Sequence, residues 1–343
     1  MIEKLSFINI LKYLSIVLFT TGALLNCASQ GASEKQSLVW PDNELYPPRI
    51  ELVEILKPQT FKETSLKQNL MDFVFGASVS SRMSQPFGVA VDSSGSVYVV
   101  EGGAGQITVF DRRTNNTRSF GERTGLIFPT DILIIDSLVY VSDGRAQRIF
   151  CYNMDGELIT KLGKRGELLN PGGMAYHEDT HKIYITDSQS HQLAVFDVET
   201  GLLDTTFGTR GTGEGEFNFP SNIAIYEDKV FVLDAMNFRV QILTLDGQYI
   251  HAFGQAGDSA GDLYRPRGIA ISSDGFVFVS DSHYSNFQIF DEDGEIYLFV
   301  GILGTNPGEF KMPADMTFDQ DDKLYVTDAQ NGRIQVFQYI KYE

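Results

Sequence analysis

The chain has few of the residues on which cofactor and disulfide chemistry depend. Its 343 residues include two cysteines, five histidines and one tryptophan. Cys27 ends an apolar segment and Cys151 lies inside a strand-like run, so the pair builds no disulfide framework, and Cys151 is expected to be a small buried hydrophobe. No nucleophile elbow, phosphate-binding loop, dinucleotide fingerprint or Cys-x-x-Cys-His haem motif occurs, so the sequence indicates none of these chemistries.

Basic residues are also scarce. The chain carries 27 Lys and Arg against 45 Asp and Glu, a formal net charge of -18. A surface of this sign repels phosphate backbones, so we expect no nucleic acid among the partners. It favours cations, basic proteins or neutral glycans, although acidic surfaces usually serve solubility alone.

Long hydrophobic runs are confined to the N-terminus. The apolar stretch from Tyr13 to Leu25 is preceded by Lys4 and Lys12 and is too short for a comfortable membrane span, which is typical of an export signal. It ends in Leu24-Leu25-Asn26-Cys27, which resembles the lipobox of bacterial lipoproteins, although Asn26 replaces the usual Gly, Ala or Ser. The alternatives are an uncleaved anchor or an ordinary signal peptide with an incidental cysteine.

The lipobox resemblance implies a signal peptide over residues 1–26 and a lipid on Cys27 that anchors the protein to a membrane. Residues 27–71 would form a tether and lead-in segment. The expected location is the bacterial cell envelope, outside the cytoplasm. Ala28 lacks the aspartate that retains some lipoproteins on the inner membrane, so the outer membrane is preferred.

Prolines recur with a period in the forties. They stand at Pro86, Pro129, Pro171, Pro220, Pro266 and Pro313. Each opens a block of β-branched and aromatic runs separated by turn residues, which predicts four strands per block. A repeat of this length is typical of a β-propeller.

The sixth block ends with the chain and lacks a fourth strand. The segment Asp72–Gly76 precedes the first proline without a block of its own, so we expect it to pair into the sixth blade and close the ring. The propeller would then span residues 72–343. Residues 40–56 are expected to form a lead-in strand on the outside of a blade.

The motifs inside the blocks resemble NHL repeats. The sixth block contains Tyr325-Val326-Thr327-Asp328 and the run Asn331 to Phe337, and a Gly-rich linker ends in Glu216-Phe217. The resemblance implies an all-β, six-bladed and monomeric propeller, and it says little about activity because one fold hosts many functions.

Positions two residues after each proline alternate around the predicted ring. They are Gly88, Asp131, Gly173, Asn222, Gly268 and Asp315. The first polar position of the third strand alternates with them, as Gln106, Arg148, Gln192, Arg239, Asn286 and Arg333. Blades two, four and six thus carry Asp or Asn with Arg, which predicts a pseudo-three-fold face.

The second strand of every block ends in an acid, at Glu101, Asp143, Asp187, Asp234, Asp281 and Asp328. With Asp131 and Asp315 the face carries eight carboxylates against four arginines, Arg267 included, so we expect its mouth to attract cations. We favour a structural reading, in which the acids cap turns and the arginines pair with Asp131, Asn222 and Asp315. Alternatively, these three residues converge on the axis and bind a metal such as Ca²⁺.

Two functions remain open. The first is a binding or scaffold module for an envelope protein, peptide or glycan. The second is a lyase or hydrolase with Ca²⁺ or Zn²⁺ in the central channel, since some NHL-like propellers, such as the peptidyl-hydroxyglycine amidating lyases, hold zinc there with histidines. The candidate ligand-binding residues are Asp131, Asn222, Asp315, Arg267, Arg148, Arg239, Arg333, His191 and His283.

Overall fold

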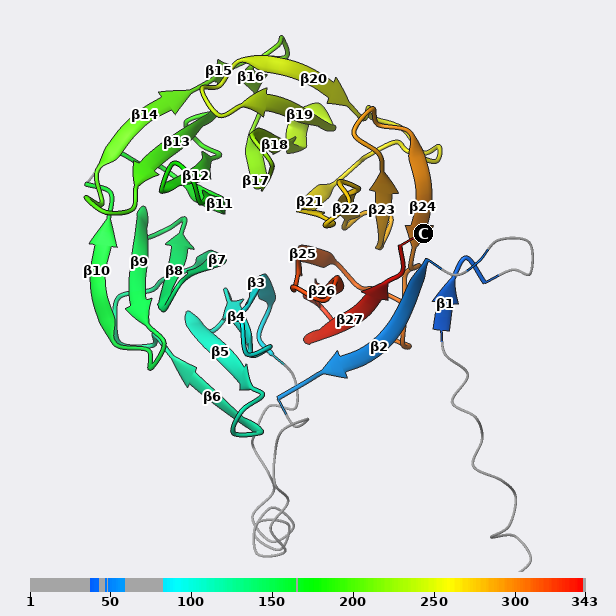
Figure 1. Ribbon diagram of the computed structural model, residues 1–343, viewed down its shortest axis with the longest axis horizontal. Helices are drawn as coiled ribbons and strands as arrows, with labels where there is room; N and C mark the ends of the chain where they lie inside the picture. Colours follow the sequence, from blue (N-terminus) through cyan, green and yellow to red (C-terminus); the bar gives the residue numbers. More distant parts are fainter. Residues whose placement is uncertain (1–37, 43–46, 48, 59–82, 165, 342–343) are drawn as a thin grey trace, which may run out of the picture. The chain divides into compact units, whose positions relative to one another are not determined.

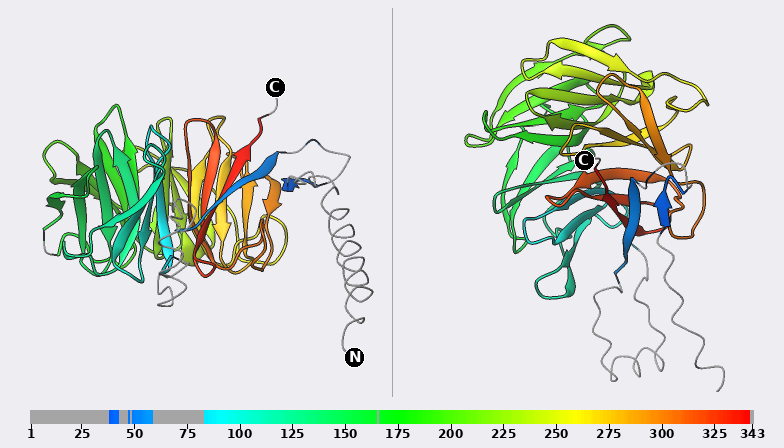
Figure 2. Two further views of the ribbon diagram at one scale, coloured as in Figure 1. Left: turned by 90° about the horizontal axis from the view of Figure 1, so that it is seen from below. Right: turned by 45° about the vertical axis from the view of Figure 1, so that its right-hand side comes forward.

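Six antiparallel sheets stand around one axis in the computed structural model, which describes residues 38–42, 47, 49–58, 83–164 and 166–341. Figure 1 looks down the ring, and Figure 2 shows it edge-on as a disk. The export signal, Cys27 and the segment 72–76 lie outside the described residues. Within the described residues, no helix has the length and hydropathy to span a bilayer.

Each blade has its first strand at the axis and its fourth at the rim. Blades one to three are β3 (Pro86–Val91), β4 (Val97–Glu101), β5 (Gln106–Asp111), β6 (Asn116–Phe120); β7 (Pro129–Ile135), β8 (Leu138–Asp143), β9 (Arg148–Asn153), β10 (Leu158–Leu162); β11 (Pro171–His177), β12 (Lys182–Asp187), β13 (Gln192–Asp197), β14 (Leu203–Phe207). Blades four to six are β17 (Pro220–Tyr226), β18 (Lys229–Asp234), β19 (Arg239–Thr244), β20 (Tyr249–Phe253); β21 (Pro266–Ile271), β22 (Val277–Asp281), β23 (Asn286–Phe290), β24 (Ile296–Val300); β25 (Pro313–Phe318), β26 (Lys323–Asp328), β27 (Arg333–Tyr339). Short β15 (Thr209–Arg210), β16 (Glu216–Phe217) and the 3₁₀ turn η1 (Ala235–Asn237) lie within blade connections.

The core lies between neighbouring blades. The second and third strands are buried on both faces, as the fully buried β22 shows, which explains why they are continuous apolar runs rather than alternating ones. The outer strands alternate between buried and exposed residues, as in β24. Cys151 in β9 is 2% exposed, which confirms its expected role as a small buried residue.

The Phe-Gly ending of the outer strands positions the linkers between blades. Gly301 follows β24 with a φ of 102°, a left-handed conformation that favours glycine. A Cβ on Gly301 would lie 2.5 Å from the ring of Phe310, the last residue of the linker motif. Glycine therefore lets the linker phenylalanine pack directly on the chain.

The ring is closed by a different N-terminal strand from the one we expected. The outer strand of blade six is β2 (Ile50–Leu56), which pairs antiparallel with β27 from Ile50 opposite Tyr339 to Leu56 opposite Ile334. The other edge of β27 pairs with β26, so no edge of β27 remains for residues 72–76. A short β1 (Leu38–Trp40) extends the sheet beyond β2. The compact unit accordingly begins at Leu38 rather than at residue 72.

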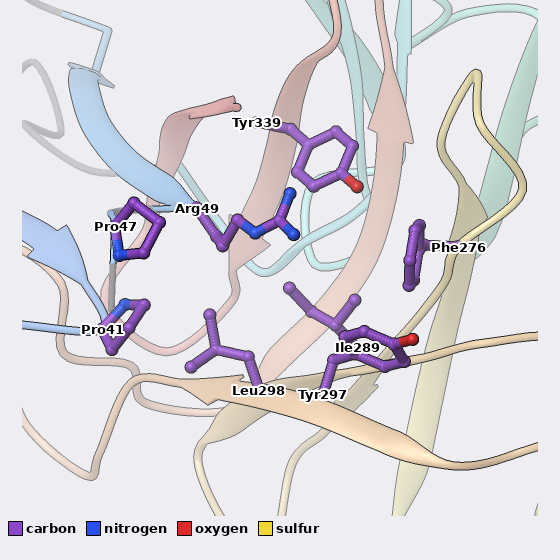
Figure 3. Close-up of a pocket in the computed structure, with 8 residues that line it drawn as sticks. All are labelled: Pro41, Pro47, Arg49, Phe276, Ile289, Tyr297, Leu298 and Tyr339. Atoms are coloured by element: carbon purple, nitrogen blue, oxygen red, sulfur yellow. The ribbon is translucent and has the colours of Figure 1, made fainter. Parts of the chain in front are cut away.

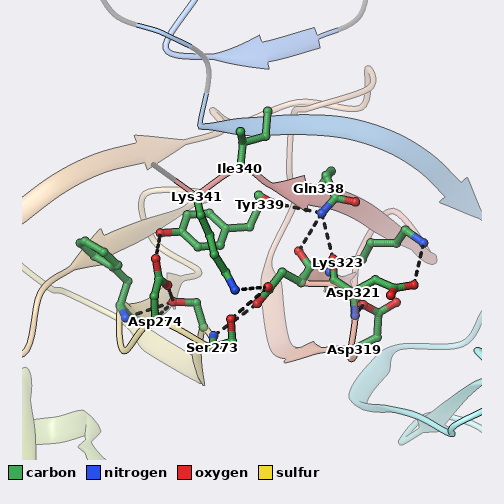
Figure 4. A network of polar contacts seen from close by, with 12 residues as sticks. Ser273, Asp274, Asp319, Asp321, Lys323, Gln338, Tyr339, Ile340 and Lys341 are labelled. Carbon is green, nitrogen blue, oxygen red and sulfur yellow. Dashed lines mark hydrogen bonds and ion pairs between the residues drawn. The ribbon is translucent and has the colours of Figure 1, made fainter. Parts of the chain in front are cut away.

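Polar contacts hold the closed blade against both neighbours. The Tyr339 hydroxyl donates to Asp274 of blade five at 3.0 Å, and the Lys341 ammonium lies 2.7 Å from the Asp322 carboxylate. Figure 4 shows this network around the end of β27. On the other side, Arg112 of blade one donates to Glu54 of β2 at 2.9 Å. Strand β2 is therefore integrated into the ring by side chains as well as by its backbone.

Candidate functional site at the channel mouth

Three polar side chains meet at the axis of the ring. Asp131, Asn222 and Asp315 come from the inner strands β7, β17 and β25 and are 6%, 8% and 9% exposed. The Asn222 Nδ2 donates to Asp315 Oδ1 at 2.7 Å. Backbone N–H groups complete the set, from Met174 to Asp131 at 2.7 Å and from Val89 to Asp315 at 3.1 Å. The structure thus brings together the triad that the sequence predicted.

Sterics explain the alternation of the triad with glycine. A Cβ on Gly88 would lie 2.5 Å from the Asp131 Cα, and one on Gly173 would lie 2.6 Å from the Asn222 Cα. The same distance from Gly268 to the Asp315 Cα is 2.7 Å. Contacts this short are not compatible with a side chain. The axis therefore has room for three side chains and not for six.

The two carboxyl groups of the triad share a proton. Asp131 and Asp315 are hydrogen-bonded to each other, which requires a proton on one of them. Burial, and next the negative charge of Asp315, raise the pKa of Asp131 well above its ordinary value. Burial raises the pKa of Asp315 to about 6, against the opposing effect of its hydrogen bonds. At neutral pH the proton therefore belongs to Asp131, and Asp315 is ionised.

The triad does not fit the metal site that we expected as an alternative. A hard cation needs several free oxygen ligands. The Asn222 Oδ1 instead accepts the Ile223 N–H at 2.7 Å, its amide hydrogens face Asp315, and Asp131 is protonated. Across the residues that the structure describes, no three His, Cys, Asp or Glu side chains are grouped so that they could hold a metal ion.

The second-strand acids cap turns, as the structural reading predicted. Asp143 accepts N–H groups from Ile127 at 2.6 Å and Phe128 at 2.9 Å, and Asp281 accepts from Tyr264 and Arg265. All six acids are 4% exposed or less. They hold each inter-blade loop against the strand turn beside it.

The arginines have different partners from those we predicted. Arg239 pairs with Asp234 at 3.0 Å and Arg333 with Asp328 at 2.8 Å, rather than with the triad. Arg148 stands opposite Asp143 in the strand register. Arg333 also donates to three carbonyls of the linker before blade six, those of Thr305, Asn306 and Glu309. Arg239 likewise donates to the Gly213 and Glu216 carbonyls, so Arg239 and Arg333 fix linkers.

These contacts engage most of the carboxylates of this face, so few charged side chains line the mouth itself. All eight carboxylates are buried and accept backbone N–H groups, and Asp131 carries a proton. Among the charged side chains that line the mouth, only Asp315 and Arg267 remain ionised.

The mouth itself is a cavity of about 510 Å³ with the triad as its floor. Its wall includes the residue that directly follows each of the six prolines, namely Phe87, Thr130, Gly172, Ser221, Arg267 and Ala314. The same triad also lines a cavity of about 300 Å³ that is formed by the inner strands. The triad therefore separates the mouth from the rest of the channel.

Arg267 differs from the other arginines because it has no hydrogen-bond or ion-pair partner among the described residues. Burial, and next the charge of Arg265, lower the pKa of Arg267. On the adjacent blade, the Ser221 Oγ is buried and lacks any hydrogen-bond partner in the described part of the chain. The mouth thus combines an unpaired cation with an unused hydroxyl.

An aromatic pair forms another part of the wall. The Phe87 and Phe128 ring centroids are 5.5 Å apart, and the Arg145 guanidinium lies 5.0 Å from the Phe128 centroid. The sequence analysis did not identify Phe87 or Ser221. The residue directly after each proline recurs in every block, so a comparison of that position would have indicated both side chains. The predicted triad came from the position after it.

The two candidate histidines do not line the mouth. The His191 Nδ1 accepts the Phe219 N–H at 3.1 Å, and its ring packs on Phe219 at 4.5 Å. The His283 ring packs on Tyr264 at 4.2 Å. Both side chains support loops.

A second concave region lies at the rim. Figure 3 shows this apolar pocket of about 360 Å³ between the lead-in segment, blade five and the end of β27. Aromatic side chains of Phe276, Tyr297 and Tyr339 surround it, and Arg49 donates to the Ile340 carbonyl at 3.3 Å. Sequence reasoning missed it because its residues come from three distant segments.

The comparisons with known proteins agree with the geometry. A family model described as a 6-bladed beta-propeller matches residues 168–252, and an NHL repeat model matches residues 310–337. The chain is a six-bladed β-propeller, and its sixth blade matches the NHL repeat. It is 26% identical over 113 residues to the protein brain tumor of Drosophila melanogaster, a match that covers 32% of this chain and spans only 10% of that protein.

Solved structures share the fold at low identity. An auxiliary nutrient binding protein from Bacteroides thetaiotaomicron has a TM-score of 0.61 at 14% identity, over 76% of this chain and 70% of that one. Virginiamycin B lyase from Staphylococcus aureus has a TM-score of 0.56 at 14% identity, over 75% and 96%. A streptogramin B lyase has a TM-score of 0.59 at 13% identity, over 85% and 98%. These likenesses show the fold alone.

The Asp131→Asn variant is expected to melt at a higher temperature than the wild type at pH 7 and at the same temperature near pH 4. An acid with a raised folded-state pKa stabilises the fold only below its unfolded pKa of about 3.9, and this contribution is lost as the pH rises through the folded pKa. Asparagine mimics the neutral acid without taking up a proton. Circular dichroism melts at both pH values measure the difference.

Asp315→Asn is the matched control. Its amide would place a donor against the N–H of Val89 or the amide of Asn222, so we expect a loss of about 1–3 kcal/mol in unfolding free energy at pH 7. A lower melting temperature for Asp131→Asn at pH 7 would show that Asp131 is ionised and contradict the shared proton.

Proposed function

We propose that the protein is an extracytoplasmic, membrane-anchored binding module that presents its channel mouth to an envelope protein, peptide or glycan. One observation carries the proposal: a cavity of about 510 Å³ is lined by an arginine with no partner among the described residues, by hydroxyl and amide groups and by an aromatic pair. Cavities of this size with a few convergent polar groups are typical of ligand sites.

Two further points support binding. The triad below the cavity is internally hydrogen-bonded, so it forms a rigid floor that needs no ligand to organise it. Most of the wall residues lie at the starts of the inner strands of the six blades, so paired strands hold them in place. The auxiliary nutrient binding protein that shares the fold offers a precedent for binding on such a scaffold.

The enzymatic alternative is a lyase or hydrolase with a metal in the channel. Virginiamycin B lyase shares the fold, but at 14% identity this likeness says nothing about the reaction. The triad does not fit a metal, since its amide oxygen and one carboxyl are already engaged. We therefore retain binding as the proposed function.

A pull-down from gently solubilised membranes tests the proposal with the tagged full chain as bait. Asn170 lines the mouth and is exposed, so Asn170→Trp is expected to fill the cavity and lose the partner that the wild type captures. Glu178→Trp places the same bulk in the β11–β12 turn at the opposite end of the blade and should capture it. Cys27→Ala should move the protein to the soluble fraction.

Equal capture by Asn170→Trp and wild type would contradict a role for the mouth. Retention of Cys27→Ala in the membrane would contradict the lipid anchor without affecting the mouth.

A further inference from the structure

We propose that the mouth cavity binds a uronic acid, a carboxylated sugar unit of a glycan, whose carboxylate pairs with Arg267. This inference rests on the proposed function and names the ligand class of the same site. It goes against the expectation from net charge, because a chain with a formal charge of -18 would be expected to repel anions. The local charges at the mouth differ from the net charge of the chain.

Arg267 supplies the positive charge. It lines the cavity, it has no hydrogen-bond or ion-pair partner among the described residues, and the nearest charge acting on it is the like charge of Arg265. Arg239 and Arg333 of this face are held by acids, and Arg145 is held by an aromatic ring. An arginine without a partner is most stabilised by an anion, and its planar fork matches a carboxylate through two parallel hydrogen bonds.

Ser221 adds a donor beside that fork. It belongs to β17 of blade four, which contacts β21 of blade five, and it stands at the same position after its proline as Arg267. Its Oγ has no hydrogen-bond partner within the described residues. A hydroxyl can rotate toward a ligand oxygen without moving the backbone. Arg267 and Ser221 therefore form one anion-binding subsite on one side of the mouth.

The remaining wall suits a ring that carries hydroxyl groups. Neutral side chains that both donate and accept hydrogen bonds line it, namely Gln85, Thr130, Asn170 and Ser188. Sugar hydroxyls also donate and accept, so they are complementary to such groups. The Phe87 and Phe128 rings present apolar faces with partial negative charge, which attract the C–H groups of a sugar ring.

The floor selects against other anions. Asp315 is ionised at neutral pH and lies in the same cavity as Arg267, so a single ligand group that carries two negative charges would meet one cation and one anion. A uronic acid has one charge, and its hydroxyls can donate to Asp315. Inorganic phosphate carries up to two negative charges on one group at neutral pH. A peptide C-terminus would bring few hydroxyls for the neutral wall.

Isothermal titration of the purified full chain tests the proposal with four probes. They are digalacturonate, its methyl ester, an N-acetylated dipeptide with a free carboxylate, and inorganic phosphate. We expect digalacturonate to bind and the other three to bind at least about 10-fold more weakly, since the ester lacks the charge that pairs with Arg267. Equal binding of the ester, or tighter binding of the dipeptide or of phosphate, would overturn the proposal.

Variants locate the subsite. Arg267→Gln is expected to weaken digalacturonate binding by about 10- to 100-fold, because it removes a charge-assisted pair. Arg265→Gln is the matched control, since Arg265 is exposed and does not line the cavity, and should change binding by less than about 3-fold. Arg267 has no partner to lose, so the melting temperature of Arg267→Gln should equal that of the wild type. Unchanged digalacturonate binding by Arg267→Gln would refute the subsite.

The experiments can refute either proposal independently of the other. If Asn170→Trp loses the membrane partner while Arg267→Gln keeps it and digalacturonate does not bind, the mouth is a binding site and the uronic acid inference is wrong. If Asn170→Trp keeps the partner, the proposed function is wrong even where digalacturonate binds in the cavity.

Discussion

Truncating Ile50 or Leu56 to alanine is expected to lower the free energy of unfolding by about 2–5 kcal/mol for each variant. Both side chains are 0% exposed, and they pack in different seams. Ile50 belongs to the cluster of blades five and six with Phe287, whereas Leu56 packs with Val97 of blade one. Strand β2 therefore seals blade six on both sides, and urea unfolding of the full chain measures the cost.

Val53→Ala is the control on the same strand. Val53 is 46% exposed, so its truncation should cost less than about 1 kcal/mol. If Ile50→Ala and Leu56→Ala unfold at the same urea concentration as Val53→Ala, β2 does not close the ring. The experiment thus decides between residues 50–56 and the segment 72–76 that the repeat pattern favoured.

The Gly88→Ala variant should lose about 1–3 kcal/mol of unfolding free energy, because its methyl group would press on the neighbouring blade. The nearest atoms are the Asp131 Cα at 2.5 Å, the Asp131 Oδ1 at 2.8 Å and the Ile132 backbone nitrogen at 2.9 Å. The side-chain oxygen can move, but the two backbone atoms cannot rotate away. Truncating the Asp131 side chain should therefore give no rescue. Urea unfolding of Gly88→Ala, alone and in an Asp131→Ala background, measures this.

Gly213→Ala provides the comparison. The atom nearest to its added methyl group is the Glu216 Oε2 at 3.1 Å, at the end of a flexible side chain. We expect a change within about 0.5 kcal/mol. A loss for Gly88→Ala no larger than that for Gly213→Ala would mean that the axis can accept more than three side chains.

The sequence predicted the blades because each blade is encoded locally. Four runs, their turns and the opening proline lie within one period, as the block from Pro266 to Gly301 shows. The closing strand was not predictable in this way. Its partner β27 is distant in the chain, and β2 lacks the Phe-Gly ending that made Asp72–Gly76 look like a member of the repeat.

The candidate site was predictable in position but not in chemistry. The alternation of Gly88 with Asp131 revealed the three-fold triad, because a steric limit at the axis leaves a trace in every repeat. The charge state of the site residues is not visible in the repeat pattern. Whether Asp143 faces solvent or accepts backbone N–H groups depends on loop geometry, and the proton on Asp131 depends on burial beside Asp315.

The pairing of β2 with β27 has a consequence for how the protein is made. About 280 residues separate Leu56 from Arg333, and ribosomes add about 5–20 residues per second, so β2 is synthesised about 15–55 s before its partner. During that interval blades one to five can assemble, while the sixth sheet lacks β27, the strand with which β2 pairs. An unpaired strand of this kind is prone to mispairing. The newly made protein therefore remains prone to aggregation until β27 has been synthesised and pairs with β2.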